Sequence, residues 1–181
     1  MILTAKNNKQ VFLRRLEERD FDHLFVYLQG LSPETKKRFG PHPFDRQSVL
    51  DFYTSSTNNW GYVAEDVETA EIVAYSIIKI GYLAHDGTRL QSYGLVFNDQ
   101  TDCTFAPSVA DSWQSFGIGN ALFEFILADL EKASIQRIIL WGGVQADNDK
   151  ALNYYKKNGF KTVGQFQNNV HNYDMILEIS Q

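Results

Sequence analysis

Apolar residues along the chain follow two periods, one typical of strands and one typical of helices. Strand-like runs, rich in β-branched and aromatic residues, lie at 11–16, 60–65, 72–80, 103–109, 137–143, 161–166 and 173–179. Apolar positions recur at helical spacing within 21–31, 46–55, 118–133 and 147–158. This order of elements predicts a single α/β domain over residues 1–181, with about seven strands flanked by helices.

Local start and stop signals set the limits of the helices. Residues 32–34 combine a capping hydroxyl, a proline at the first helical position and an early acid, so a further short helix is expected over 33–39. Asp20 and Asp45 are placed to cap the helices that follow them. Gly159 is expected to end the last helix in the left-handed conformation that closes helices.

The stretch 81–102 follows neither period. Its segment 85–88, His-Asp-Gly-Thr, is a turn signal. Residues 90–97 are interpreted either as a strand extension or lid, or as part of a decorated hairpin. Long connections in compact domains often carry function, so both alternatives stay open at this point.

Composition narrows the class of protein. The 181 residues are 44% hydrophobic and 22% charged, as in an ordinary globular domain, and the net charge of −5 argues against nucleic-acid binding. One cysteine and four scattered histidines offer neither a disulfide nor metal-ligand spacing, so we expect no metal. There is no signal-peptide core and no apolar run near the ~20 residues of a membrane span. We therefore expect a cytoplasmic protein without a membrane partner.

The stretch 108–120 joins a strand to a helix through a turn that contains Gly117 and Gly119. Such a turn directs backbone N–H groups and the positive end of the helix dipole to one point. Glycine lets the backbone approach a ligand closely, and the point suits phosphate oxygens. On local grounds alone, a glycine-rich connection that merely ends a strand is the alternative.

Two motifs resemble those of the Gcn5-related N-acetyltransferase (GNAT) family. Gln114-x-x-Gly117-x-Gly119 resembles its acyl-CoA pyrophosphate loop, and Asn148-x-x-Ala151-x-x-x-Tyr155-x-Lys157-x-Gly159-Phe160 resembles its downstream motif. They occur in the right order, and the resemblance covers residues 103–178. It implies the acyl-CoA N-acyltransferase (GNAT) fold, a mixed, mostly antiparallel sheet in which the fourth and fifth strands splay apart. Pro107 suits such a splay, because proline lacks a donor that would otherwise lie unpaired.

The resemblance also implies an activity and a set of site residues. The activity is transfer of an acetyl group from acetyl-CoA to a primary amine, by direct attack in a ternary complex. Tyr155 is implied as the acid that protonates the leaving thiolate, and the Val109 N–H as the oxyanion donor. Asn148 is either a cofactor contact or a helix cap. The expected cofactor-binding residues are Ser108, Val109, Gln114, Ser115, Phe116, Gly117, Ile118, Gly119, Asn120, Asn148 and Tyr155.

Two positions depart from the commonest family pattern. Ser115 stands where the family most often has glycine, and Asp111 stands where it frequently has proline. Neither change removes the backbone N–H groups of the loop. Because the Asp111 carboxylate is negative, we expect it to point away from the phosphate site, toward solvent or the acceptor.

The general base is left open by the sequence. Asp102 and Glu65 are the catalytic candidates at strand ends and His42 is a further one, while a surface or turn role is the alternative for each. Cys103 is disfavoured as a nucleophile, because it begins a buried strand and has no paired histidine in sequence.

The acceptor is expected to be a small-molecule or peptide amine, and the acidic chain favours a cationic one. Dimers are common in the family, so a homodimer is an open possibility. Two rival functions remain. One is an acyl-CoA-binding sensor or interaction module without turnover. The other is a nucleotide-binding protein with an unrelated glycine loop, which is disfavoured because no Lys-Ser/Thr follows the loop.

Overall fold

The computed structural model describes residues 1–179, which form two compact units that are interleaved in sequence. The first unit comprises Met1–Ile78 and Ala106–Ala128, and the second comprises Lys79–Phe105 and the residues from Asp129 onward. Strand β5 (Asp102–Val109) and helix α5 (Ile118–Lys132) have residues in both units. Neither unit is therefore a continuous segment of the chain.

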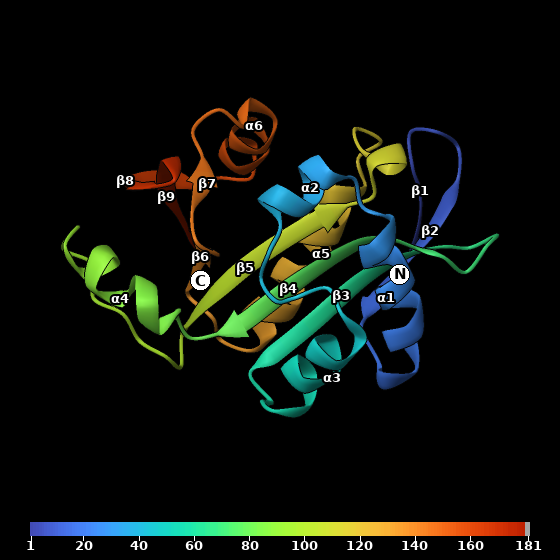
Figure 1. The fold of residues 1–181 in the computed structure, drawn as a ribbon, viewed down its shortest axis with the longest axis horizontal. Helices are drawn as coiled ribbons and strands as arrows, with labels where there is room; N and C mark the ends of the chain where they lie inside the picture. The colour runs from blue at the N-terminus through green and yellow to red at the C-terminus, as the bar shows by residue number, and fades with distance from the viewer. Residues whose placement is uncertain (180–181) are drawn as a thin grey trace. The chain divides into compact units, whose positions relative to one another are not determined.

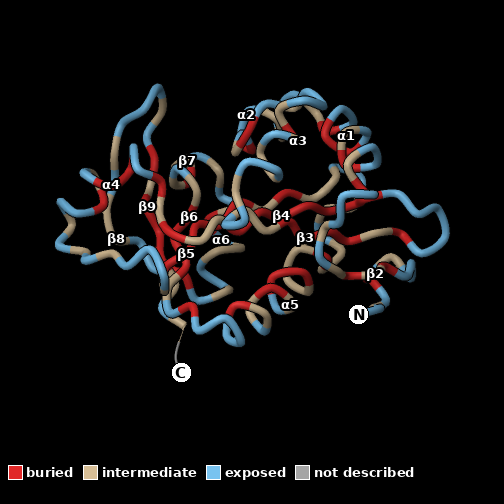
Figure 2. Tube along the Cα trace, turned by 90° about the horizontal axis from the view of Figure 1, so that it is seen from below, coloured by how far each residue is buried: buried red, intermediate tan, exposed pale blue. Residues whose placement is uncertain are grey.

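The first unit is a sheet with helices on both faces. Helices α1, α2 and α3 cover one face and α5 covers the other, as two perpendicular views show (Figures 1 and 2). The strands lie in the order β1, β2, β3, β4, β5. The elements that precede β5 are β1 (Ile2–Thr4), β2 (Gln10–Arg15), α1 (Phe21–Gly30), α2 (Pro33–Arg38), α3 (Arg46–Thr54), β3 (Asn59–Asp66) and β4 (Ile72–Ile80).

The second unit is built around strand β9. In it, β5 pairs in parallel with β6, and β6 pairs antiparallel with β9. Strands β7 and β8 also pair with β9, both antiparallel. Leu90, Ile139 and Ile176 form its buried apolar cluster. Its remaining elements are α4 (Ala84–Gln91), β6 (Arg137–Leu140), β7 (Val144–Gln145), α6 (Asp149–Lys157), β8 (Lys161–Asn168) and β9 (Val170–Glu178).

The predicted sheet type is confirmed and the predicted number of strands is wrong. The sheet is mixed and mostly antiparallel, with β5–β6 as the parallel pair among the described registers. Within residues 1–179 it has nine strands rather than about seven. The two additional strands, β1 and β7, are three and two residues long, which is too short for a period-2 pattern to mark them.

Helix starts that depend on local chemistry are confirmed for α2 and α3. The Ser32 side chain accepts a hydrogen bond from the Thr35 N–H, and the Asp45 side chain accepts one from the Ser48 N–H. The role expected for Asp20 is wrong, because its side chain makes no cap bond to α1. Its carboxylate instead accepts hydrogen bonds from the Glu17 N–H at 2.8 Å and from Arg14 Nη2 at 2.9 Å.

Of the expectations for 81–102, the decorated hairpin agrees with the structure, because this stretch joins the neighbouring strands β4 and β5 and the Gly81 N–H donates to the Asp102 carbonyl at 2.8 Å. The turn at 85–88 and the strand at 90–97 are wrong, since the first lies in helix α4 and the second begins in it. The reason is tertiary. Arg89 on α4 donates from Nε and Nη2 to the buried carboxylate of Asp174 on β9, at 2.8 and 3.1 Å. Tyr93 donates to the same carboxylate at 2.9 Å. These partners are 81 and 85 residues away in sequence, so no local pattern reveals the helix.

Candidate functional site

The turn between β5 and α5 has the geometry expected of an anion-binding loop. The 3₁₀ turn Asp111–Trp113 follows β5, and α5 begins at Ile118. Gln114 Nε2 donates to the Val109 carbonyl at 3.2 Å and so braces the turn from within. The Lys6 N–H donates to the Phe116 carbonyl at 3.1 Å, which ties the far side of the loop to the β1–β2 connection. The loop backbone is therefore held by the first unit itself.

Two residues of this loop have left-handed backbone conformations. Ser115 has φ +69° and Gly117 has φ +90°. Alternating conformations of this kind turn nearby N–H groups toward one side and make a concavity for anions. A Cβ placed on Gly117 would meet only the Lys6 side chain, at 3.9 Å, among the described residues, so the loop surface is open at that point. The start of α5 adds the positive end of a helix dipole.

The edge of β5 that faces away from β4 carries the groups of interest. The Ala110 N–H donates to the Val73 carbonyl of β4 at 2.9 Å. Since the backbone groups of successive strand residues point to opposite edges, those of Val109 and Pro107 point away from β4. Pro107 has no N–H to leave unpaired there, and Val109 presents one. This arrangement agrees with the expectation drawn from Pro107.

Ser108 lies on the opposite edge and its side chain belongs to a buried polar cluster. The Ser108 hydroxyl donates to the Tyr75 carbonyl at 3.0 Å and lies 2.9 Å from the Tyr27 hydroxyl. It is 7% exposed. Burial raises the pKa of Tyr27, so its phenol stays protonated and donates to Ser108. The side chain of Ser108 thus links β5, β4 and α1.

A second buried chain of hydrogen bonds runs through His42, Tyr75 and Tyr53. His42 Nδ1 lies 2.7 Å from the Pro43 carbonyl, which only accepts, so Nδ1 carries the hydrogen of the neutral ring. Nε2 is then the acceptor for the Tyr75 hydroxyl at 3.1 Å, and Tyr75 lies 2.5 Å from the Tyr53 hydroxyl. Burial lowers the pKa of His42, against smaller opposing effects of Pro43 and Asp45.

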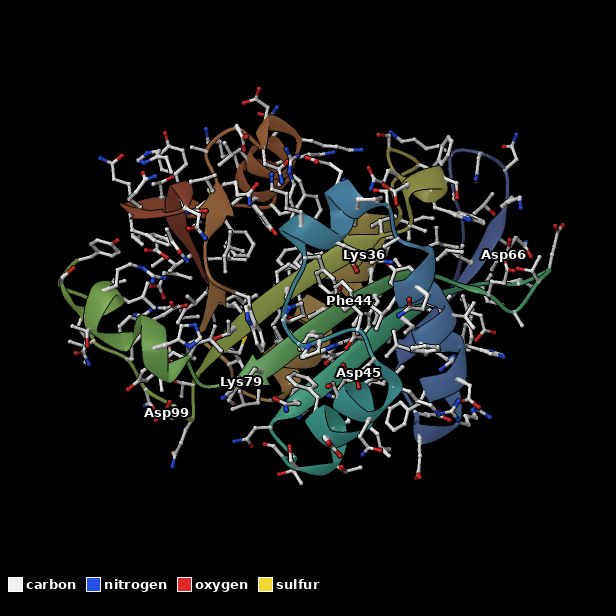
Figure 3. The ribbon with its side chains drawn as sticks, viewed as in Figure 1. Lys36, Phe44, Asp45, Asp66, Lys79 and Asp99 are labelled. Carbon is white, nitrogen blue, oxygen red and sulfur yellow. The ribbon has the colours of Figure 1, made fainter. Side chains whose placement is uncertain are left out.

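Aromatic rings surround this chain of hydrogen bonds on the face of the sheet that α1, α2 and α3 cover. Phe39 stacks on Phe44 with centroids 6.1 Å apart and meets Tyr75 edge-on at 5.9 Å. His42 lies 5.0 Å from the Phe52 ring centroid. Figure 3 shows Phe44 on the connection between α2 and α3, on the face that these helices cover. The hydrogen bonds of Tyr27 and Tyr53 to β5 and β4 could not be predicted from the sequence, because each tyrosine is simply an aromatic residue in a helix.

Both acidic candidates for the general base are ion-paired. Glu65 accepts from Arg14 Nη2 at 2.5 Å, and Arg14 also binds Asp20. Asp102 is 3% exposed, accepts from the Asn98 N–H at 2.8 Å and lies 3.4 Å from Arg137 Nη1. Burial raises the pKa of Asp102, opposed by the Asn98 bond and by Arg137. These contacts favour structural roles for both carboxylates.

The downstream motif lies in the second unit, on α6. Asn148 caps that helix, with its side chain accepting from the Ala151 N–H at 3.2 Å. Tyr155 is half-buried, and its ring packs edge-on against Phe160 at 5.4 Å. Burial raises the pKa of Tyr155, so the phenol is protonated at neutral pH. Gly159 ends the helix with φ +87°, as predicted.

The predicted site residues are therefore distributed over both units. Within the first unit the structure brings together Ser108, Val109 and the loop 114–120, all on β5 or directly after it. Glu65 is in that unit too, where it pairs with Arg14. Asp102, Asn148 and Tyr155 belong to the second unit.

Comparison with known proteins now decides the family. The sequence model of the Acetyltransferase (GNAT) family matches residues 28–160, which is well over half of the chain. The chain belongs to this family. No curated protein matches the sequence.

Solved structures show the GNAT fold over nearly the whole chain. The GNAT domain of S. lividans PAT has a TM-score of 0.76 at 18% identity, over 99% of this chain and 96% of that chain. The acetyltransferase of GNAT family from Streptococcus pneumoniae has a TM-score of 0.69 at 19% identity, over 94% and 99%. The structure of yncA from Salmonella typhimurium with its cofactor acetyl-CoA has a TM-score of 0.70 at 13% identity, over 94% and 95%.

The described residues also bear on metal groups, membrane helices and the thiol of Cys103. No group of three or more His, Cys, Asp and Glu side chains among residues 1–179 is arranged to hold a metal ion. The helices within that range include none whose length and apolar character would suit a membrane span. Cys103 is fully buried, and burial raises the pKa of its thiol, which disfavours the reactive thiolate.

Proposed function

We propose that this protein is an N-acetyltransferase that moves an acetyl group from acetyl-CoA to a primary amine, by direct attack in a ternary complex. The observation that carries the proposal is the left-handed pair Ser115 and Gly117 at the start of α5, which suits a diphosphate. Membership of the GNAT family supports it, as does the similar fold of yncA, solved with acetyl-CoA.

The chain's own groups have complementary roles in this proposal. Acetyl-CoA supplies the acetyl thioester. The backbone of residues 114–120 holds the diphosphate, and Gln114 keeps the loop in shape through Val109. The Val109 N–H, on the edge of β5 away from β4, stabilises negative charge on the reacting carbonyl oxygen. Tyr155, which matches the tyrosine of the family's downstream motif, donates a proton to the leaving sulfur.

The acceptor is proposed to be an amine that carries positive charge elsewhere or lies at a basic peptide end. The support is the net charge of −5, which attracts cations over acidic amines. A panel of primary amines of opposite charge tests this directly. Faster turnover of acidic amines than of basic ones would contradict it.

One observation favours the alternative of an acyl-CoA-binding module without turnover. Glu65 and Asp102, the two carboxylates expected to act as base, are both engaged by arginines. A bound arginine competes with a substrate ammonium group for the carboxylate oxygens. The enzyme therefore needs another base or a water chain, whereas a sensor needs none.

The test combines cofactor binding with thiol release. Calorimetry with CoA measures binding, and release of free thiol from acetyl-CoA in the presence of the amine panel measures turnover. Binding with turnover of at least one amine is expected. Binding without turnover of any amine would favour the sensor, and absence of CoA binding would overturn the proposal.

A matched pair of variants locates the binding site. Gly117→Trp fills the loop surface and should abolish CoA binding. Gly94→Trp makes the same change at a glycine with φ +78°, on the connection after α4, and carries similar backbone strain. CoA should bind Gly94→Trp as it binds the wild type. Equal loss in both variants, or in neither, would contradict the assigned loop.

A further inference from the structure

Asp111 occupies an unusual place between the proposed cofactor loop and helix α2. Its backbone begins the turn that leads into the loop, and its carbonyl accepts from the Gln114 N–H at 3.5 Å. Its side chain leaves the loop and binds the start of α2. Oδ2 accepts from the Ser32 N–H at 3.0 Å, and Oδ1 accepts from the Ser32 and Thr35 hydroxyls, each at 2.8 Å.

These hydrogen bonds stabilise the negative charge on the Asp111 carboxylate. Partial burial acts to raise the pKa of its carboxyl, but the bonds from Ser32 and Thr35 outweigh it and lower that pKa. The carboxylate is thus charged and engaged by α2 at neutral pH. It is not directed at the loop where phosphate is proposed to bind.

Helix α2 depends on contacts at its ends. It has six residues and none of them is buried. A helix this short is not stable by itself in water, so contacts made elsewhere must hold it. Asp111 supplies one such contact at the N-terminal end, and Lys36, labelled in Figure 3, donates from Nζ to the Gln29 carbonyl of α1 at 2.8 Å.

The other end of α2 leads to the aromatic cluster, which comprises the rings of Phe39, Phe44, Phe52 and Tyr75 around His42. The Phe39 N–H donates to the carbonyl of Thr35, the residue whose hydroxyl binds Asp111, at 2.9 Å. Phe39 is buried and meets the ring of Tyr75, which is the hydrogen-bond partner of His42. A continuous series of contacts within the first unit therefore runs from Gln114 through Asp111, Thr35 and Phe39 to Tyr75.

We propose that Asp111 is a positioning residue that couples the cofactor loop to α2 and the aromatic cluster beyond it, so that a coenzyme bound at the loop stabilises α2. The inference rests on the proposed function, because it requires CoA to bind at residues 114–120. It does not require the protein to turn over any amine. Asp111 itself touches neither the coenzyme nor the acceptor in this scheme.

Hydrogen exchange with CoA as the probe tests the coupling. In the wild type, saturating CoA should slow amide exchange in the loop and, by at least about fivefold, in residues 34–39. In Asp111→Ala, CoA should still slow exchange in the loop but change it less than about twofold in 34–39. Because coupling is reciprocal, the CoA dissociation constant should rise by about the factor lost in α2.

Controls separate this role from simple helix capping. Asp45 is likewise a carboxylate bound at the start of a helix, where it accepts from the Ser48 N–H and hydroxyl, but it has no bond to the loop among those described, so Asp45→Ala should leave CoA-dependent protection of 34–39 intact. Ser32→Ala with Thr35→Val removes the two hydroxyl donors to Asp111, leaves the backbone N–H of residue 32, and should reproduce most of the effect of Asp111→Ala. Adding Asp111→Ala to that pair should then have little further effect.

The outcomes are distinguishable from those of the proposed function. If CoA protects the wild-type loop but not 34–39, the coupling is overturned while the cofactor site stands. Retained protection of 34–39 in Asp111→Ala, or its loss in Asp45→Ala, would also overturn the coupling. If CoA does not bind the wild type, the proposed function fails and this inference fails with it.

Discussion

At the scale of single residues, Ser115 is one of the non-glycine residues that adopt a left-handed backbone conformation. An L-residue at φ +69° pays about 1–2 kcal/mol for the left-handed conformation. Glycine would remove that cost but gains unfolded-state freedom of about 0.4–1 kcal/mol. Ser115→Gly should therefore raise the free energy of unfolding by up to about 1 kcal/mol, measured by urea denaturation.

Ser112 provides the control for this change. It is exposed like Ser115 but lies in the 3₁₀ turn, outside the left-handed residues. Ser112→Gly should lower the free energy of unfolding by about 0.5–1 kcal/mol, because only the unfolded state gains. Equal destabilisation by both variants would show that the left-handed backbone at Ser115 costs nothing.

Tyr155 can be tested by a one-atom change. Tyr155→Phe keeps the ring against Phe160 and removes the proposed proton donor. We expect kcat for thiol release to fall by roughly 10²–10⁴, with the CoA dissociation constant nearly unchanged. Tyr154→Phe, on the same helix, is the matched control and should keep most of kcat. A similar kcat for both variants would remove Tyr155 from the mechanism.

For some candidate residues the sequence predicts the local conformation, whereas for others the decisive contact lies far away in sequence. The sequence predicts Gly159 because left-handed helix ends select glycine, and Gly117 because glycine lets the backbone approach a ligand closely; both have a positive φ. The charge partners of Glu65 and Asp102 were not, since Arg14 and Arg137 are 51 and 35 residues away. A motif fixes a residue type and a spacing, whereas an ion pair depends on which strands become neighbours.

At the scale of elements, the buried chain through His42 ties the α2–α3 connection to β4. The pKa of His42 is lower in the folded protein than its ordinary value of about 6.5. Below about pH 6.5 His42 is protonated in the unfolded chain but stays neutral in the folded protein until the pH reaches its lower folded pKa. The free energy of unfolding therefore falls as pH decreases between these two pKa values. The slope contributed by His42 approaches 1.36 kcal/mol per pH unit at most.

His42→Gln should remove this contribution from the pH dependence of unfolding, measured by urea denaturation between about pH 7 and pH 5. The charged or titratable groups facing His42 are Asp45 and the phenols of Tyr75 and Tyr53, which are kept in the variant. His85→Gln is the control, because its side chain is 76% exposed and His42 stays in place. An unchanged slope in His42→Gln would refute the argument.

Helix α4 depends on one buried ion pair. Asp174 is 1% exposed, and Arg89 also reaches Asp86 on its own helix at 2.8 Å. Arg89→Ala should destabilise the protein by about 3–5 kcal/mol, because it leaves a buried carboxylate uncompensated. Amide exchange in residues 84–97 should accelerate more than elsewhere.

Adding Asp174→Asn to Arg89→Ala should recover part of the lost stability, since one of the two buried carboxylates that Arg89 binds is then neutral. Arg19→Ala breaks an exposed pair with Glu17 and should have little effect. If Arg89→Ala were as mild as Arg19→Ala, the ion pair with Asp174 would not be what holds α4, and the apolar cluster around Leu90 would hold it instead. Because Asp174 is 85 residues away from Arg89, local patterns do not predict α4. They do predict α2 and α3, because adjacent residues cap those helices.

At the scale of the whole molecule, the question is whether two compact units make one domain, as the length of the chain predicts. Strand β5 changes unit between Phe105 and Ala106, and helix α5 changes unit between Ala128 and Asp129. Strand β4 crosses the boundary too, since Lys79 and Ile80 belong to the second unit. Unfolding either unit alone would require β4, β5 and α5 to be ordered over only part of their length. Such partly ordered elements lose hydrogen bonds and burial without gaining full chain entropy, so we expect the units to unfold together.

The three tryptophans report on the two units separately. Trp60 and Trp113 belong to the first unit and Trp141 to the second. Trp141→Phe therefore leaves fluorescence from the first unit, and Trp60→Phe with Trp113→Phe leaves it from the second. In each variant the urea midpoint by fluorescence should equal the midpoint by far-UV circular dichroism, which controls for stability lost through the substitutions. A fluorescence midpoint that departs from the dichroism midpoint in either variant would mean that the units unfold independently, and that continuity of β5 and α5 does not make them one domain.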